Sequence, residues 1–178
     1  MALATVTPEE LAKSVRNIPD FPKPGIQFKD ITPVLANARL FAGCIDLLTA
    51  DFKPGSVDAV VGIDARGFIF AAAAALRLQA GFVPIRKKGK LPYQTHEENY
   101  ELEYGSNTIA IHVDSLHPGS RVILVDDLLA TGGTAGAAIA LLKKIDADIL
   151  EASFFIELKF LEGRSKLGGI KVRSLVTY

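Results

Sequence analysis

The chain has 178 residues, which fits one domain and leaves no room for two of ordinary size. Hydrophobic residues make up 49% and charged residues 22%, a balance typical of a soluble globular protein that folds without disulfides or structural metal. Lys and Arg total 20 and Asp and Glu total 20, and this zero net charge argues against a protein whose main task is to bind nucleic acid.

The cysteine, histidine and apolar patterns exclude further classes. The single cysteine, Cys44, excludes an intramolecular disulfide and a cysteine-based zinc cluster, and its helical spacing with nearby Leu and Phe residues predicts a buried, inert thiol. The three histidines lack metal-ligand spacing. The longest apolar run, residues 68–76, is far shorter than the roughly 20 residues of a membrane span. With no signal-peptide pattern at the N-terminus, we expect a cytoplasmic protein without membrane contact.

The first part of the chain predicts two helices separated by a proline-rich segment. Thr7 is a typical N-cap and Pro8 a typical first helical residue, so a helix is expected to run to about Val15. Three prolines within residues 19–24 exclude a helix and predict a stiff extended segment. Residues 37–50 predict a second, amphipathic helix that Asn37 caps.

From residue 57 onward, short apolar segments alternate with helical ones. Strands are expected at residues 57–63, 82–85, 121–125, 149–156 and 172–176. An alanine-rich helix ending near residue 79 follows the first strand, and a helix over residues 134–144 follows the third. Apolar strands separated by helices predict a mainly parallel sheet covered on both faces, that is, a doubly wound α/β domain.

Residues 87–113 depart from this rhythm. Residues 100–104 and 109–113 alternate between apolar and polar side chains on either side of Gly105-Ser106-Asn107, which predicts an antiparallel β-hairpin inserted in the parallel fold. Residues 87–99 are polar and charged without periodicity, so a mobile loop is expected there. Long loops of this kind often act as lids.

The strongest chemical signal follows the third predicted strand. Residues 126–134 read Asp-Asp-Leu-Leu-Ala-Thr-Gly-Gly-Thr and lead directly into a helix. Glycines let the backbone approach a ligand, helix N-terminal amides hold phosphate, and carboxylates suit sugar hydroxyls or a cation. The segment therefore favours a sugar phosphate over the alternative of an ordinary turn with a solvated acidic pair. It matches neither a Walker loop nor a GxGxxG dinucleotide fingerprint.

Residues 122–134 resemble the phosphoribosyl-pyrophosphate (PRPP) signature of type I phosphoribosyltransferases. Four further segments, residues 19–31, 62–68, 85–92 and 102–105, resemble the adenine-using members of that family, so that the likeness extends from Pro19 to Tyr178. It implies a single domain over residues 1–178 with a small N-terminal hood of about residues 1–35. It also implies a flexible lid and hairpin at about residues 87–113.

The resemblance also implies a reaction. The enzyme would transfer the 5-phosphoribosyl group of PRPP to N9 of adenine, giving AMP and pyrophosphate in purine salvage. It would be a homodimer that depends on Mg²⁺, with the ion carried in by PRPP and no direct protein ligand for the metal.

The resemblance assigns the PRPP-binding roles to three groups of residues. The ribose hydroxyls would be bound by Asp126 and Asp127. The 5′-phosphate would be held by Ala130, Thr131, Gly132, Gly133 and Thr134. Pyrophosphate would be held by Asp64, Ala65 and Arg66, around a peptide of unusual conformation, and by the basic residues Arg86, Lys87 and Lys90, some of which would serve the neighbouring subunit. Many family members have Ser at the position of Ala65, so only a backbone contact is expected there.

The adenine-binding roles fall on five residues. Phe28 would stack on one face of the purine and Leu158 on the other, while Gln27 and Lys29 would read the base through backbone groups. Glu103 would accept the proton of purine N7, which makes N9 a better nucleophile. Together the assignments predict a basic zone, around Arg66 and residues 86–90, that is separate from an acidic zone formed by the two aspartates and Glu103.

Taken alone, several of these residues also fit ordinary structural roles. Residues 86–90 are typical of a solvated loop, Glu103 of the wet face of a hairpin, and Phe28 of a core side chain. Tyr104 fits either lid packing or a substrate contact. Two other functions also stay open: a phosphoribosyltransferase for xanthine, guanine or hypoxanthine, and a PRPP-sensing regulator that binds nucleic acid. Zero net charge and the lack of an added helix-turn-helix segment argue against the regulator.

Overall fold

A computed structural model describes residues 5–101 and 106–178 of the chain. The helices in this part are α1 (Pro8–Ser14), α2 (Thr32–Leu35), α3 (Ala38–Leu48), α4 (Gly67–Leu78) and α5 (Gly133–Lys144), with the 3₁₀ helices η1 (Lys159–Leu161) and η2 (Gly163–Leu167). The strands are β1 (Arg16–Pro19), β2 (Gln27–Asp30), β3 (Ala59–Ile63), β4 (Gly81–Lys87), β5 (Thr95–Glu101), β6 (Ser106–His112), β7 (Arg121–Leu129), β8 (Asp148–Glu157) and β9 (Val172–Thr177).

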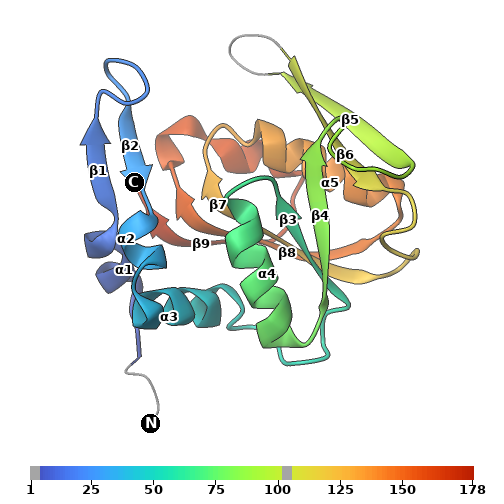
Figure 1. Ribbon diagram of the computed structural model, residues 1–178, viewed down its shortest axis with the longest axis horizontal. Coiled ribbons are helices and arrows are strands. Elements are labelled where there is room, and N and C mark those ends of the chain that lie inside the picture. The colour runs from blue at the N-terminus through green and yellow to red at the C-terminus, as the bar shows by residue number, and fades with distance from the viewer. Residues whose placement is uncertain (1–4, 102–105) are drawn as a thin grey trace.

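Within the described residues, seven strands form the central sheet in the order β5-β6-β4-β3-β7-β8-β9. The run from β4 to β9 is parallel, whereas β6 is antiparallel to both β4 and β5. Helices α3 and α4 lie on one face and α5 on the other (Figure 1). This arrangement confirms the predicted α/β fold.

Alternating residues of the parallel strands supply the two cores. Val60 and Phe155 pack with α3 and α4, while their neighbours Val61 and Phe154 pack with α5 on the opposite face. This division follows from the pleat of a strand, which points successive side chains to opposite faces. Because both faces are covered, the strands are apolar at nearly every position.

The N-terminal elements agree with the sequence except around the prolines. Thr7 caps α1 by accepting a hydrogen bond from the backbone N–H of Glu10, and Asn37 caps α3 in the same manner. The proline-rich segment is not a simple extended stretch, because β1 and β2 pair antiparallel on either side of the turn at residues 20–26. The isolated β1–β2 pair stands beside one edge of the central sheet (Figure 1).

The predicted loop at residues 87–99 is wrong over its second half. Thr95–Asn99 belongs to β5, which pairs along its whole length with β6. The pairing also corrects the hairpin, because Ser106 and Asn107 lie in β6 rather than in a turn. Lys144 of α5 stabilises this polar strand by donating to the carbonyl oxygen of Glu97 at 2.8 Å. An edge strand held by backbone bonds and charges has no apolar periodicity to reveal it.

Two other expectations can be compared with the structure. Cys44 is fully buried, and burial raises the pKa of its thiol, in agreement with an inert side chain. Strand β7 extends four residues beyond its predicted end, so that Asp126 and Asp127 lie inside the strand. Among the helices of the described residues, none combines the length and the apolar character needed to cross a membrane.

Candidate active site

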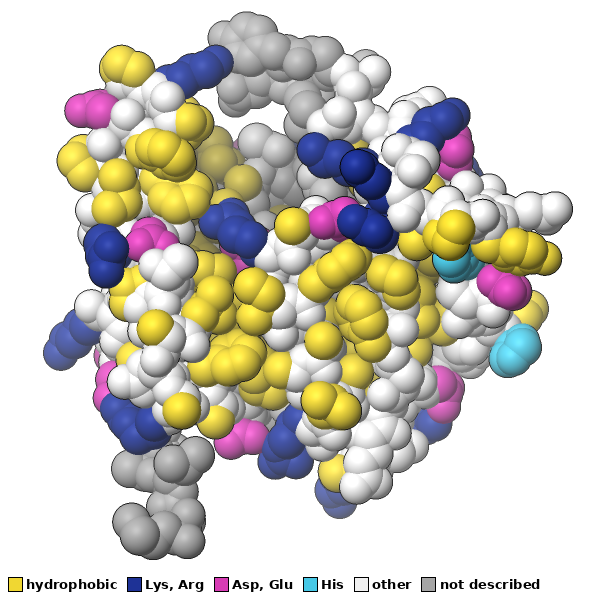
Figure 2. All heavy atoms as spheres, viewed as in Figure 1, with side chains coloured by type: hydrophobic (Ala, Val, Ile, Leu, Met, Phe, Trp, Pro, Cys, Tyr) yellow, Lys and Arg dark blue, Asp and Glu magenta, His cyan; other side chains and the backbone are white. Residues whose placement is uncertain are grey.

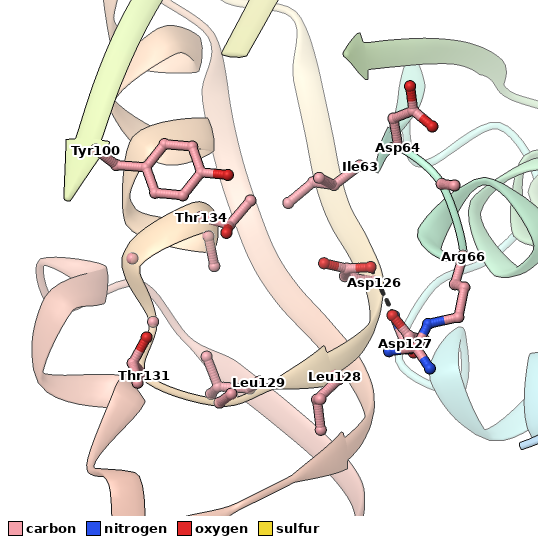
Figure 3. A pocket seen from close by; sticks show the side chains of 15 residues that line it. Ile63, Asp64, Arg66, Tyr100, Asp126, Asp127, Leu128, Leu129, Thr131 and Thr134 are labelled. Carbon is pink, nitrogen blue, oxygen red and sulfur yellow. Dashed lines mark hydrogen bonds and ion pairs between the residues drawn. The ribbon is translucent and has the colours of Figure 1, made fainter. Parts of the chain in front are cut away.

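A cavity of about 390 Å³ opens at the carboxyl ends of β3 and β7. This volume is in the range of small-molecule sites, and the edge is where open parallel sheets bind ligands. Ten of the residues predicted from the sequence line it: Asp64, Ala65, Arg66, Asp126, Asp127, Ala130, Thr131, Gly132, Gly133 and Thr134. Figure 3 shows Asp126 and Asp127 side by side, with Arg66 against Asp127 and the threonines across the cavity.

The loop at residues 130–134 forms one wall and runs into α5. Gly132 has a φ of 76°, in the left-handed region, and α5 begins at the next residue. A Cβ atom on Gly132 would overlap the carbonyl oxygen of Gly163 in η2, so the two backbones touch directly. Because the first backbone amides of a helix have no partners within the helix, this end of α5 offers N–H groups to an anion.

The two aspartates of β7 meet the start of α4. The backbone N–H of Asp127 donates to Oδ1 of Asp126 at 2.8 Å, and the guanidinium of Arg66 lies 2.9 Å from Oδ2 of Asp127. A Cβ atom on Gly67 would come within 2.5 Å of Oδ1 of Asp126. The missing side chain at this glycine therefore lets α4 approach the acidic pair closely.

Burial and charge both change the protonation of these aspartates. Burial raises the pKa of Asp126 well above its usual value, and repulsion from Asp127 adds to the increase. Burial also raises the pKa of Asp127, while the nearby positive charge of Arg66 works against that increase. The pair thus holds its negative charge at a cost that a hydroxyl donor or a cation would reduce.

The residues predicted to bind pyrophosphate form a second set of contacts. The peptide bond between Asp64 and Ala65 is cis, the unusual conformation that the resemblance implied. Nε of Arg86 donates to Oδ2 of Asp64 at 2.9 Å, and its Nη1 donates to the carbonyl oxygen of Lys90 at 3.2 Å. Lys87 and Lys90 are exposed. Arg86, Lys87 and Lys90 are not among the residues that line the cavity, although Arg86 reaches it through Asp64.

This geometry corrects the predicted separation of charges. Arg66 pairs with Asp127, and Arg86 pairs with Asp64. The predicted basic and acidic zones are therefore interleaved. The physical reason is that a buried carboxylate without a cation or a hydrogen-bond donor is costly in a folded protein.

Four of the five residues predicted to bind adenine, namely Gln27, Phe28, Lys29 and Leu158, also lie outside the cavity lining. The guanidinium carbon of Arg66 is 5.4 Å from the ring centroid of Phe28 on β2, which connects this ring to the cavity. Leu158 donates its backbone N–H to the carbonyl oxygen of Leu129, a cavity residue, at 2.9 Å. Gln27 is exposed, and Nζ of Lys29 lies 3.5 Å from the ring centroid of Tyr178.

Five residues of the cavity lining were not predicted from the sequence: Ile63, Tyr100, Leu128, Leu129 and Ala135. Of these, Tyr100 brings a polar side-chain group. Tyr100 of β5 lines the cavity, and its hydroxyl points inward opposite Ile63 (Figure 3). The alternating pattern around Tyr100 predicted a hairpin, but the direction of the Tyr100 side chain depends on the strand register, in which Tyr100 pairs with Asn107. Glu103 and Tyr104 lie outside the described residues.

Comparisons with known proteins identify the family. The model of the phosphoribosyl transferase domain matches residues 28–161. An adenine phosphoribosyltransferase of Acidothermus cellulolyticus is 57% identical over 168 residues, which cover 94% of this chain and 95% of the relative. The chain belongs to the adenine phosphoribosyltransferase family.

Solved structures of this family have the same fold. The adenine phosphoribosyltransferase of Rhodothermus marinus matches with a TM-score of 0.91 and 48% identity, covering 96% of this chain and 98% of its own. The adenine phosphoribosyltransferase of Saccharomyces cerevisiae, solved with adenine and an imino-altritol bisphosphate, matches with a TM-score of 0.90 and 43% identity. That match covers 94% of this chain and 97% of the yeast chain.

Proposed function

We infer that the chain carries out the reaction of its family in the cavity described above. It is an enzyme that transfers the 5-phosphoribosyl group of PRPP to N9 of adenine, giving AMP and pyrophosphate. The observation that carries this conclusion is the cavity itself, where an acidic strand end continues into a glycine loop and a helix N-terminus. Family membership over nearly the whole chain identifies the base.

We propose a division of roles for PRPP along the cavity wall. Asp126 and Asp127 accept hydrogen bonds from the ribose hydroxyls, which gives the two buried carboxylates the donors they need. The loop at residues 130–134 surrounds the 5′-phosphate with backbone N–H groups. Arg66 and the backbone at residues 64–65 bind the pyrophosphate group, on which negative charge grows as the bond to ribose breaks. This division is supported by where these residues lie in the cavity.

For adenine we propose that Phe28 and Leu158 contact the two faces of the ring, with Gln27 and Lys29 contributing backbone groups. The contacts of Phe28 with Arg66, and of Leu158 with Leu129, support a base site that adjoins the ribose site. Glu103, as the family resemblance implies, accepts the N7 proton. General-base help of this kind is worth typically 10²–10⁴-fold in rate.

Magnesium belongs to the proposal as an ion that binds together with PRPP. Among residues 5–101 and 106–178 no three His, Cys, Asp or Glu side chains gather as a metal cluster. Mg²⁺ keeps several of its waters and binds the phosphates of a substrate, so PRPP can carry the ion into the cavity without a direct ligand from the protein. When bound, the ion would neutralise charge on the pyrophosphate leaving group.

We also propose a homodimer, on the basis of an exposed apolar surface. Hydrophobic side chains gather over α4 in the middle of the face shown in Figure 2, with Lys and Arg side chains above them. Ile69, Leu76 and Phe82 are exposed by 41%, 83% and 37%. Apolar patches of this kind commonly mark subunit contacts, and a twofold contact would also bring residues 86–90 near the partner.

Two expectations from the sequence remain predictions. The first is the division into an N-terminal hood of about residues 1–35 and a flexible lid and hairpin of about residues 87–113. The second is the cytoplasmic location, which is the usual compartment of a protein whose one cysteine is a buried free thiol.

A panel of purine bases tests the proposed function. The protein is mixed with PRPP, Mg²⁺ and adenine, guanine, hypoxanthine or xanthine, and nucleotide formation is followed by chromatography. We expect AMP from adenine to be the dominant product. Preferred use of guanine or hypoxanthine would contradict the assignment of the base. In parallel, Glu103→Gln should lower turnover by roughly 10²-fold or more while the Kd for PRPP stays nearly unchanged.

A further inference from the structure

The 3₁₀ helix η2 packs against the loop at residues 130–134, which binds the 5′-phosphate in the proposed function. A Cβ atom on Gly132 would overlap the carbonyl oxygen of Gly163, and a Cβ atom on Gly163 would overlap the carbonyl oxygen of Ala130. No side chain separates the two backbones, and Cα of Gly163 lies only 3.0 Å from the Cβ position of Gly132. Any displacement of Gly163 is therefore transmitted directly to the loop.

The residue after Gly163 is anchored to the central sheet. Nε and Nη2 of Arg164 donate to the two carboxylate oxygens of Glu157, each at 2.7 Å. The side chain of Glu157 is only 4% exposed, so its charge depends on this partner. A two-point bond between a planar guanidinium and a carboxylate fixes direction as well as distance. Leu167, 1% exposed, holds the other end of η2 in the core.

The anchoring strand β8 adjoins the cavity through its neighbour β7. Glu157 is the last residue of β8, and the next residue, Leu158, donates its backbone N–H to Leu129 at the end of β7. The ion pair between Arg164 and Glu157 thus connects η2 to the end of β8, which in turn is hydrogen-bonded to the cavity residue Leu129 of β7 through Leu158. The 5′-phosphate loop is held between this support and the start of α5.

We propose that Arg164 is a positioning residue that sets the shape of the 5′-phosphate loop through its two-point bond to Glu157. This role rests on the proposed function, in which residues 130–134 bind the phosphate. Loop amides hold phosphate well only when they are fixed before the ligand arrives, since a small displacement weakens several hydrogen bonds at once. Arg164 itself does not touch the substrate.

The test is the variant Arg164→Lys, which keeps the positive charge but cannot bridge both oxygens of Glu157. Calorimetry gives the Kd values of AMP and adenosine, two ligands that differ only in the 5′-phosphate. We expect the preference for AMP over adenosine to fall about tenfold, corresponding to the loss of a single hydrogen bond to a charged group. In turnover the KM for PRPP should rise by a similar factor, with kcat changed less than about twofold.

A matched control comes from the same strand. Nε of Arg173 on β9 donates to Oε1 of the fully buried Glu151 on β8 at 2.7 Å, within a network that also includes Lys171 and Asp51. Glu151 lies opposite Ile123, upstream of the cavity residues of β7. Arg173→Lys should lower stability, to a smaller extent because Lys171 still pairs with Glu151 at 2.8 Å, and should leave the preference for AMP unchanged. A general loss of stability would not lower the preference for AMP over adenosine in either variant. A loss of that preference in Arg164→Lys alone is therefore predicted only by a positioning role.

Each outcome decides a different point. A folded Arg164→Lys variant with the wild-type preference for AMP overturns the positioning role, and so does an equal loss in the Arg173→Lys control. If Arg164→Lys does not fold, the double variant of Glu157→Gln with Arg164→Gln, which leaves no unpaired buried charge, replaces it with the same expected loss. A wild-type protein that forms no AMP from adenine and PRPP would instead overturn the proposed function, and the role of Arg164 with it.

Discussion

Replacing Gly132 by alanine perturbs the loop at residues 130–134 in two ways at once. Gly132 has a φ of 76°, where an L side chain is strained, and its Cβ would overlap the carbonyl oxygen of Gly163. Two other glycines separate these effects. Gly55 has a φ of 79° with nothing within 4 Å of the Cβ position, so Gly55→Ala introduces the strain alone. Gly163→Ala introduces the overlap, with the carbonyl oxygen of Ala130, at a residue whose φ is not in the left-handed region.

The magnitudes follow from these environments. A side chain in the left-handed region costs about 1–2 kcal/mol, which is the full expected effect of Gly55→Ala. Overpacking costs about 1–3 kcal/mol, the expected effect of Gly163→Ala. Because the atom that Gly132→Ala would strike is a main-chain carbonyl, held by the anchored η2 segment, it cannot move aside like a flexible side chain. The two costs should therefore add to about 2–5 kcal/mol in Gly132→Ala.

Urea unfolding of the three variants and the wild type, followed by circular dichroism, gives the free energies of unfolding. We expect Gly132→Ala to lose the most and Gly55→Ala the least, with Gly132→Ala alone among these two also losing affinity for AMP. Equal losses for Gly132→Ala and Gly55→Ala would refute the reasoning, because they would mean that the close approach between the loop and η2 costs nothing when it is filled.

Three further predictions concern charge and assembly. Burial raises the pKa of Asp126, so the folded state keeps a proton that the unfolded chain loses; the resulting stabilisation is complete below about pH 4 and is lost as the pH rises through the folded pKa. Urea unfolding across pH should therefore show the free energy of unfolding of Asp126→Asn rising relative to the wild type from about pH 4 upward, and a constant difference would contradict this. Asp127→Asn releases Arg66 from its ion pair, so calorimetry should show pyrophosphate alone binding about threefold tighter. PRPP should bind more weakly, because the variant lacks the carboxylate proposed to bind its ribose hydroxyls. Weaker binding of both ligands would contradict the pairing. If the proposed homodimer forms through the apolar surface over α4, Leu76→Asp should convert it to a monomer in sedimentation velocity, while Phe160→Asp, 73% exposed on η1, should not. A dimer that survives Leu76→Asp would place the contact elsewhere.

The elements of the fold that could be predicted are those whose buried positions carry apolar side chains in a recognisable pattern. The five residues of β3 are all apolar and all buried, and the sequence therefore marks the strand. Strand β5 has no such signal, because its stability comes from pairing with β6 and from Lys144 on α5, which is distant in sequence but adjacent in space. The single turn of α2 at Thr32–Leu35 was also missed, since four residues are too few to show a helical period.

The candidate site divides along a similar line. The residues of a continuous segment, such as 126–134, could be predicted because strand, loop and helix follow one another in the chain. The inward direction of Tyr100 depends on strand register, and the contact of Gly163 with Gly132 joins segments distant in sequence. Neither is encoded by local residue patterns, because both arise only when separate elements pack together.

The pairing of charges in the cavity bears on how it selects its ligand. Arg66 already has a carboxylate partner in Asp127, and Asp64 already has a cation partner in Arg86. A pyrophosphate that takes Arg66 leaves the buried carboxylate of Asp127 without its cation, which costs free energy. A molecule that carries a diphosphate and sugar hydroxyls together gives Arg66 a new anion and Asp127 new donors in the same event. The interleaved charges therefore favour the joined substrate over its separate parts, which a cavity with its acids and bases in separate zones would not do.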